Sequence, residues 1–115
     1  MAHDIHAHLR FFPASAQKVR LVLDLVRGKD ATEALDLLRF SPQGAAQPVM
    51  KLLSSAISNA EENFGVSRDD LFVAKIFANE APTRKWRRFG ARGRFKPVLR
   101  RTSHVTVILR ERKTA

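Results

Sequence analysis

Apolar residues recur with helical spacing over the first half of the chain. Spacing of i, i+3, i+4 and i+7 is typical of a helix with one buried face. The first predicted helix begins after Ser15, a suitable N-cap, and ends at Gly28, a residue type that often closes helices in a left-handed conformation. Its buried face would consist of Val19, Val22, Leu23 and Val26.

A second helix is predicted to follow almost at once. Asp30 and Glu33 fit the N-cap and N3 positions of a capping box, although Asp replaces the usual Ser or Thr. The apolar stripe of this helix would be formed by Ala31, Ala34, Leu35 and Leu38.

A third, longer helix is predicted in the middle of the chain. Ser41 and Pro42 favour a helix start, but Pro48 inside a helix would cost about 3 kcal/mol. We therefore expect either a kink at Pro48 or a helix that begins near Gln47, and an end close to Gly65. The apolar stripe would be formed by Val49, Leu52, Leu53, Ala56, Ile57 and Ala60.

Alternation with a period of two predicts strands toward both ends of the chain. A short first strand would contain Ile5, Ala7 and Leu9. A second strand follows Asp70, and its partner runs from residue 102 to 112. Strict alternation divides the second strand into one face with Leu71, Val73, Lys75 and Phe77 and another with Phe72, Ala74, Ile76 and Ala78.

Together these elements predict an α+β fold, with three helices packed on a small antiparallel sheet and a long protruding β-hairpin. A chain of 115 residues suits one domain over 1–115. The connection from Ala81 to Arg101 is long for a structureless loop, so we expect strand pairing to continue into it. Strands of about twenty residues at about 3.3 Å per residue reach on the order of 65 Å. An arm of about 79–103 would therefore project from the body.

The positive charge of the chain is concentrated in this arm. Residues 1–80 contain nine Lys or Arg and ten Asp or Glu, whereas residues 81–115 contain twelve basic residues and one acid, Glu111. Ten basic residues and no acidic one lie between Ala81 and Arg110. A salt-bridged surface needs both signs interspersed. This segment therefore predicts a polyanionic partner, and nucleic acid in particular.

The residue types in the arm favour RNA. Eight of the ten cations between Ala81 and Arg110 are arginine, whose planar guanidinium makes paired contacts with phosphate. Trp86, Phe89 and Phe95 are interleaved among the cations, a combination suited to unstacked RNA bases, although Phe95 could instead pack across the hairpin. Gly90 and Gly93 would let the backbone turn sharply or approach a phosphate.

Three histidines open the chain. The strand pleat would place His6 and His8 on one face and His3 on the other, and no acidic or cysteine ligand stands ready to complete a metal site. We expect solvated or phosphate-facing histidines and no metal site. The chain has no cysteine, no signal-peptide-like apolar segment and no run of about 18 apolar residues, so we expect a cytoplasmic protein without a membrane partner.

Two other functions stay open on the residues alone. An architectural DNA-binding protein with basic β-arms would share the helical body and the basic arm. Such proteins are usually dimers, and no strong coiled-coil seam is present here, so we do not expect a homo-oligomer. A metal nuclease would have to use the acidic pairs Glu61-Glu62 or Asp69-Asp70, which are more often solvated surface. Catalytic motifs are missing, so we expect neither enzyme activity nor a cofactor.

Six ordered blocks of the chain resemble the universal large-subunit ribosomal protein twenty-two family in its bacterial form. They are SAQKVRLVLDLVRGK at 15–29, EALDLL at 33–38, KLLSSAISNAEEN at 51–63, APTRKW at 81–86, ARGR at 91–94 and RRTSHVTVIL at 100–109. The resemblance implies a structural protein that binds large-subunit ribosomal RNA, bridges RNA domains during assembly and lines the peptide exit tunnel with its hairpin. The implied partners are neighbouring ribosomal proteins, including protein four, and the nascent peptide.

The resemblance also implies which residues contact RNA. On the body these are Lys18, Arg20 and the run from Arg101 to His104, and the remaining positions belong to the arm. Ala81 and the Phe89-Gly90 pair depart from the usual family pattern, so no role toward antibiotics is carried over. With the arm pattern added, the predicted RNA-binding residues are Lys18, Arg20, Arg84, Lys85, Trp86, Arg87, Arg88, Arg92, Gly93, Arg94, Lys96, Arg100, Arg101, Ser103 and His104.

Overall fold

Three antiparallel strands form one sheet in the order β1-β3-β2. The computed structural model describes residues 4–89 and 95–112, of which 84–89 and 95–100 are described by their backbone alone. The strands are β1 (Ile5–Phe12), β2 (Leu71–Phe89) and β3 (Phe95–Glu111). The predicted short first strand and the antiparallel pair are confirmed, and β3 lies between the other two.

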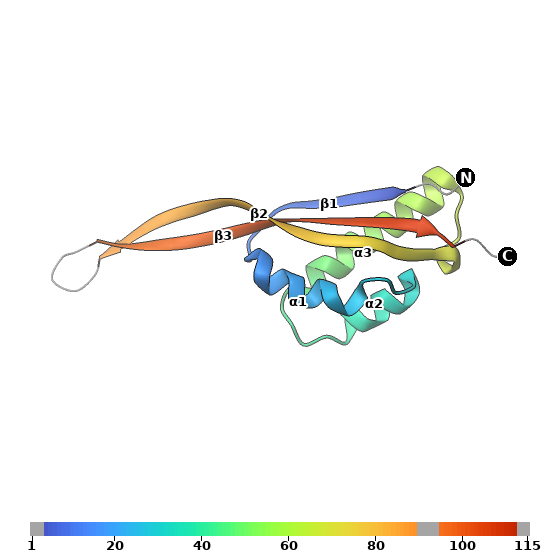
Figure 1. Ribbon diagram of the computed structural model, residues 1–115, viewed down its shortest axis with the longest axis horizontal. Coiled ribbons are helices and arrows are strands. Elements are labelled where there is room, and N and C mark those ends of the chain that lie inside the picture. The colour runs from blue at the N-terminus through green and yellow to red at the C-terminus, as the bar shows by residue number, and fades with distance from the viewer. Residues whose placement is uncertain (1–3, 90–94, 113–115) are drawn as a thin grey trace.

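Three helices lie beside one end of this sheet, and none of them accompanies β2 and β3 to the other end (Figure 1). They are α1 (Ala16–Val26), α2 (Ala31–Arg39) and α3 (Ala46–Phe64), followed by a 3-10 turn, η1 (Arg68–Asp70). The predicted α+β fold is confirmed. Gly28 and Gly65 follow α1 and α3 with φ of 78° and 66°, a left-handed conformation that glycine adopts at little cost.

The predicted helix start at Ser41 and Pro42 is wrong. The segment from 41 to 45 is a loop, and α3 begins at Ala46. A helix started at Pro42 would place the ring of Pro48 in its interior, against a carbonyl of the preceding turn. Beginning at Ala46 puts Pro48 in the first turn, where a backbone donor is not needed. The alternative start near Gln47 is therefore the correct one.

The predicted capping box of α2 is also wrong in its hydrogen bonds. Asp30 does occupy the N-cap position with extended backbone, but its side chain makes no cap bond. Its Oδ1 accepts instead from Nε of Arg112 at 2.7 Å, and the Arg112 guanidinium lies 4.7 Å from the ring centroid of Phe72. By contrast, the predicted N-cap Ser15 accepts from the backbone N–H of Lys18 at 3.4 Å.

The core lies between the helices and one face of the sheet, which we call the inner face. Every predicted helical stripe contributes buried residues to it, and the central strand contributes alternate positions. The largest fully buried side chains are Ile5, Leu23, Leu38, Leu53, Ile57, Leu71, Leu109, Val19, Val22, Val26, Val49 and Val73. Burial of this apolar surface is the main force holding the helices to the sheet.

A bulge in β2 changes which side chains face the core. The pairing register shifts between Val73 and Lys75, so that one extra residue is inserted and the alternation reverses. Leu71 and Val73 are buried before the bulge, and Ile76 and Ala78 are buried after it. The predicted division of this strand into faces is therefore wrong beyond Val73, and Lys75 and Phe77 lie on the exposed side.

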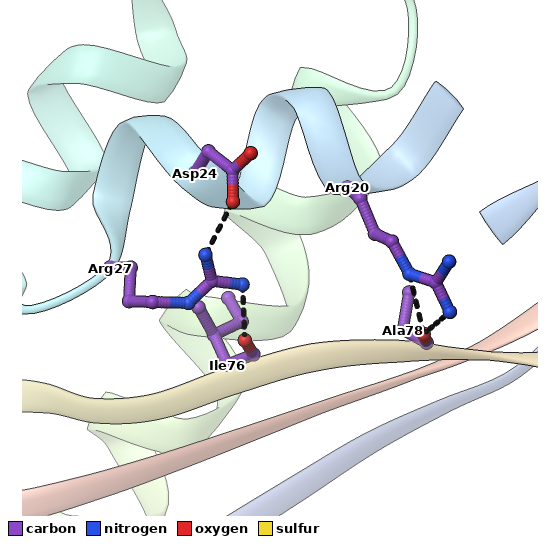
Figure 2. Close-up of polar contacts among 5 residues, drawn as sticks. All are labelled: Arg20, Asp24, Arg27, Ile76 and Ala78. Atoms are coloured by element: carbon purple, nitrogen blue, oxygen red, sulfur yellow. Dashed lines mark hydrogen bonds and ion pairs between the residues drawn. The ribbon is translucent and has the colours of Figure 1, made fainter. Parts of the chain in front are cut away.

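The free edge of β2 is occupied by groups from α1 and the segment that follows it. Two arginines reach β2, Arg20 from within α1 and Arg27 from the C-cap of this helix (Figure 2). Arg20 donates from Nε and Nη2 to the carbonyl oxygen of Ala78, at 3.1 and 2.9 Å. Arg27 donates from Nη2 to the carbonyl oxygen of Ile76, at 3.0 Å. Arg27 also pairs with Asp24. Farther along, the backbones of Gly28 and Lys29 exchange hydrogen bonds with Val73. Edge strands left open promote association with other chains, and this one is closed over the body.

Beyond the body, β2 and β3 continue as a two-stranded arm (Figure 1). Pairing extends to Phe89 opposite Phe95, with a second register shift between Ala81 and Arg84. Pro82 lies in this irregularity, where a missing backbone donor is tolerated, and its carbonyl accepts from Oγ1 of Thr102 at 2.9 Å. The molecule measures 69 × 25 × 19 Å with a radius of gyration of 17.4 Å, against about 13 Å for a compact chain of this length. The predicted protruding hairpin is confirmed.

Replacing Leu53, which is fully buried on α3, with alanine should lower the free energy of unfolding by about 2–5 kcal/mol, because a cavity remains in the core. Leu21→Ala is the matched control, since Leu21 is 59% exposed and should change stability by less than about 0.5 kcal/mol. Urea unfolding monitored by circular dichroism measures both. Equal losses in the two variants would contradict the assigned core.

Candidate nucleic-acid interface

The register of the arm places basic residues opposite one another. Arg84 lies opposite Arg100, and Arg88 lies opposite Lys96. Like charges at directly opposed positions destabilise an antiparallel pair, and an isolated two-stranded hairpin is at best marginally stable in water. The arm therefore concentrates positive charge on a framework that gains stability from an anionic partner.

Most of the predicted RNA-binding residues belong to this arm. The described arm backbone carries Arg84, Lys85, Trp86, Arg87, Arg88, Lys96 and Arg100. Arg92, Gly93 and Arg94 lie outside the described residues. Phe89 and Phe95, two of the aromatic residues predicted to stack on bases or pack across the hairpin, form the last described pair of the ladder. Gly90, predicted to allow a sharp turn, lies outside the described residues.

The predicted body residues are distributed over two elements near the junction with the arm. Lys18 is exposed on α1, and Arg101 is exposed on β3. Arg20 is also exposed, but two of its guanidinium nitrogens already donate to the Ala78 carbonyl. Lys18 and Arg101 can thus present their charge outward, whereas Arg20 has a structural role in joining α1 to β2.

Ser103 does not fit its predicted role as an RNA contact. It is 0% exposed, and its hydroxyl has no hydrogen-bond partner among the described residues. It lies on the inner face, in alternation with Val105 and Val107, which are equally buried. His104 comes from the same sequence run, but it projects to the other face because a strand turns adjacent side chains to opposite faces.

His104 lies on the opposite face, which we call the outer face, and its ring is held in a defined orientation. Nδ1 accepts a hydrogen bond from the backbone N–H of Phe11 at 3.1 Å, so the neutral ring carries its proton on Nε2. The Phe11 ring meets the imidazole edge-on, with centroids 4.7 Å apart. Phe11 has φ of 54° and lies where the β1 register shifts between Leu9 and Phe12.

The outer face was largely missed by the sequence analysis. It carries the side chains that alternate away from the helices on all three strands. His6 and His8 do share it, as predicted; their ring centroids are 6.3 Å apart, and Nδ1 of His8 and Oγ1 of Thr106 are joined at 3.1 Å. Its positions are His6, His8, Arg10, Phe11, Phe72, Lys75, Phe77, Asn79, His104, Thr106, Ile108 and Arg110. Recognising the bulge at Ala74 would have placed Lys75 and Phe77 here.

Asp4, a carboxylate next to the outer face, is already paired with an arginine. Asp4 precedes β1 and accepts from Nε and Nη2 of Arg110 at 2.6 and 3.3 Å. This hydrogen bond lowers the pKa of the Asp4 carboxyl below its ordinary 3.8, and the carboxylate in turn raises the pKa of Arg110. Asp4 therefore does not offset the charge of the other cations.

The acidic pairs considered for a nuclease are on the body surface. Glu61 accepts from Nε of Arg68 at 2.8 Å, and Asp69 lies in η1 with its backbone N–H bonded to Oγ of Ser67. Among residues 4–89 and 95–112, no cluster of three or more His, Cys, Asp or Glu side chains is arranged to hold a metal. Over the same residues, no helix has the length and apolar character needed to span a bilayer.

An acid titration should detect the Asp4–Arg110 pair. Because the folded-state pKa of Asp4 is lowered, the pair favours the folded state above the ordinary pKa, and this contribution disappears as the pH falls through the lowered value. Carboxyl chemical shifts followed by NMR should give Asp4 a pKa below 3.8. Arg110→Gln should restore the ordinary value, and an unchanged Asp4 titration in that variant would contradict the pairing.

Two substitutions in one sequence run should separate a surface contact from a buried one. Arg101→Gln should weaken binding to a large-subunit RNA transcript and reduce its salt slope by about 1. Ser103→Ala should leave the affinity unchanged and keep or raise stability, by up to about 1 kcal/mol, because a buried hydroxyl without a partner carries a desolvation cost. Fluorescence anisotropy and urea unfolding measure these effects. Loss of affinity in Ser103→Ala with its stability intact would return Ser103 to the contact set.

Two comparisons with known proteins match most of this chain. Residues 7–110 match the model of the family described as ribosomal protein L22p/L17e. The chain is also similar to the large ribosomal subunit protein uL22 of Pediococcus pentosaceus, with 48% identity over 99 residues that cover 86% of this chain and 84% of that protein. Residues 7–110 include all three helices, all of β2, and β1 and β3 except for their terminal residues.

Proposed function

We propose, from the premise that this chain belongs to the ribosomal protein L22p/L17e family, that it binds large-subunit ribosomal RNA through its basic arm. Family membership makes the protein a structural constituent of the large subunit of the cytoplasmic ribosome and not an enzyme.

The charge of the arm is the observation that carries this proposal. Nine cations and no carboxylate occupy residues 81–103, and the pairing register sets Arg84 against Arg100 and Arg88 against Lys96. Neither helices nor a third strand flank the ladder beyond the body (Figure 1). Phosphates that approach from the outside would remove the repulsion between these opposed cations.

The mechanism is non-catalytic. Arginine and lysine side chains along the arm neutralise closely spaced phosphates, while the folded body fixes the origin and direction of the arm. A structure 69 Å long can contact RNA segments that are remote from one another and hold them together. In this way the protein would bridge RNA domains during assembly of the subunit.

The same geometry supports a place for the arm in the peptide exit tunnel. An arm only two strands wide can enter a narrow RNA-walled passage, which the wider body, with helices packed on its sheet, cannot. There it would line the tunnel, lie beside ribosomal protein four and meet the nascent peptide. These partners are inferred from the family resemblance together with the length and thinness of the arm.

Binding to large-subunit RNA should weaken steeply with salt. If six to ten phosphates are engaged, the slope of log affinity against log salt should be about −4 to −9, since each contact contributes roughly −0.7 to −0.9. The double variant Arg84→Gln/Arg88→Gln should make the slope shallower by about 1–2. Arg68→Gln, which removes a body cation paired with Glu61, is the control and should leave the slope unchanged.

Competition distinguishes RNA from the architectural DNA alternative. A duplex DNA of equal length should displace the large-subunit transcript far less effectively than unlabelled transcript does, at matched salt concentration. A nearly flat salt dependence would reject binding through the arm, and preferential binding of the duplex would favour the DNA function.

A further inference from the structure

We infer that the end of β1 is held by a pH-sensitive latch, namely the hydrogen bond between the Phe11 backbone and the His104 ring, which breaks when the ring is protonated. The latch lies at the end of the body from which the arm starts, so its state decides how firmly the root of the arm is held. This inference concerns the free protein and goes beyond the proposed function, because it does not depend on RNA.

The latch requires a neutral imidazole. The Phe11 backbone N–H donates to Nδ1 of His104 at 3.1 Å, and an amide N–H can only donate. In the imidazolium form both ring nitrogens carry a proton, so Nδ1 becomes a donor that faces another donor. Histidine is the side chain that ordinarily changes charge between pH 5 and 8. Acidification over this range therefore removes the acceptor and breaks the bond.

A second histidine of the same sheet makes a contact that tolerates protonation. Nδ1 of His8 and Oγ1 of Thr106 lie 3.1 Å apart, and a hydroxyl can donate to a neutral ring or accept from a protonated one. The His8 contact therefore survives acidification, because the hydroxyl hydrogen rotates away. The His104 contact has no such freedom, since its partner is a backbone amide.

Opening of the latch also releases strained backbone. Phe11 has φ of 54°, in the left-handed region, which costs free energy for a residue with a Cβ. Such a conformation persists where surrounding contacts enforce it. The contacts here are the hydrogen bond to Nδ1 of His104 and the edge-on packing of the two rings, with centroids 4.7 Å apart. Loss of the hydrogen bond therefore lets Phe11 return to an ordinary, negative φ.

The outer face offers a protonated His104 no free carboxylate among the described residues. Asp4, next to this face, is paired with Arg110. Glu80 lies opposite the buried Ser103 in the register, so it belongs to the inner side, where the helices also lie. The titratable and charged side chains that share the outer face with His104 are His6, His8 and Arg10 on β1, Lys75 on β2 and Arg110 on β3. An imidazolium formed here stands among cations, which favours opening of the latch over a new ion pair.

The latch lies next to the root of the arm. Phe12, the last residue of β1, pairs with Ser103, and the β2–β3 register shifts just beyond this point, after Ala81. The β1 register is irregular in the interval before Phe12, which leaves the bond between Phe11 and His104 as a tie across that interval. When this bond opens, the end of β1 frays, and β3 loses its second neighbour just before it leaves the body.

NMR of the full-length chain tests the latch directly. A scalar coupling through the hydrogen bond, between the Phe11 amide nitrogen and Nδ1 of His104, should be present at pH 7.5 and absent at pH 5. Hydrogen-exchange protection, corrected for the intrinsic effect of pH, should fall about five- to tenfold for the amides of 9–12 and 103–105, because one backbone hydrogen bond is lost. The amides of 5–8 and 106–109, around the His8 contact, should keep their protection.

Two substitutions of His104 separate its titration from the presence of an acceptor. His104→Asn places a carbonyl oxygen as many bonds from the backbone as Nδ1, and this acceptor does not titrate, so the end of β1 should stay protected at both pH values. His104→Phe keeps a ring for Phe11 to pack against but has no acceptor, and should show the low protection at both. His8→Asn is the matched control and should keep the pH response of the unmodified protein.

The outcomes decide for or against the latch. Loss of the pH response in His104→Asn, with the response kept in His8→Asn, supports it. A coupling and a protection pattern unchanged at pH 5 in the unmodified protein would overturn it, and so would a pH response that persists in His104→Asn. If His104→Phe does not fold, the unmodified protein and His104→Asn still give the answer. RNA plays no part in these measurements, so the latch and the proposed function can fail separately.

Discussion

One antiparallel ladder, between β2 and β3, serves both halves of this molecule. Over the body, β3 also pairs with β1, and its inner positions Val105, Val107 and Leu109 are completely buried under the helices. Beyond Pro82 the ladder continues without helices or a third strand, a situation in which a hairpin is only marginally stable. The arm therefore takes its register and direction from the packed end of the same strands.

The two ends of the ladder use arginine differently. Arg20 and Arg27 donate from their guanidinium groups to carbonyl oxygens at the β2 edge that does not pair with another strand, and Arg110 is paired with Asp4, so these cations stabilise the body. Residues 81–103 of the arm contain no carboxylate with which to do the same. Its cations are left for a partner, and the fold confines them to a region that does not have to be stable alone.

Periodicity in the sequence predicted the elements because it reports burial directly. The stripes of α1, α2 and α3 and the alternation of β3 all face the core. What it could not predict depended on contacts between distant residues: Asp30 bonds Arg112 instead of capping α2, and the bulge after Val73 reverses one strand. The charged arm was visible as an acid-free segment, whereas the outer face draws together residues from 6 to 110.

The run from Arg101 to His104 shows why a sequence block cannot be transferred whole to a binding site. Its central Ser103 is buried on the inner face, while His104 is held on the outer face by Phe11. A strand offers one side of itself to a given partner, so contacts must recur at every second residue. Along β3 these positions are His104, Thr106, Ile108 and Arg110. Because β3 continues from them into the arm, this strand fixes the direction of the arm relative to the outer face of the body.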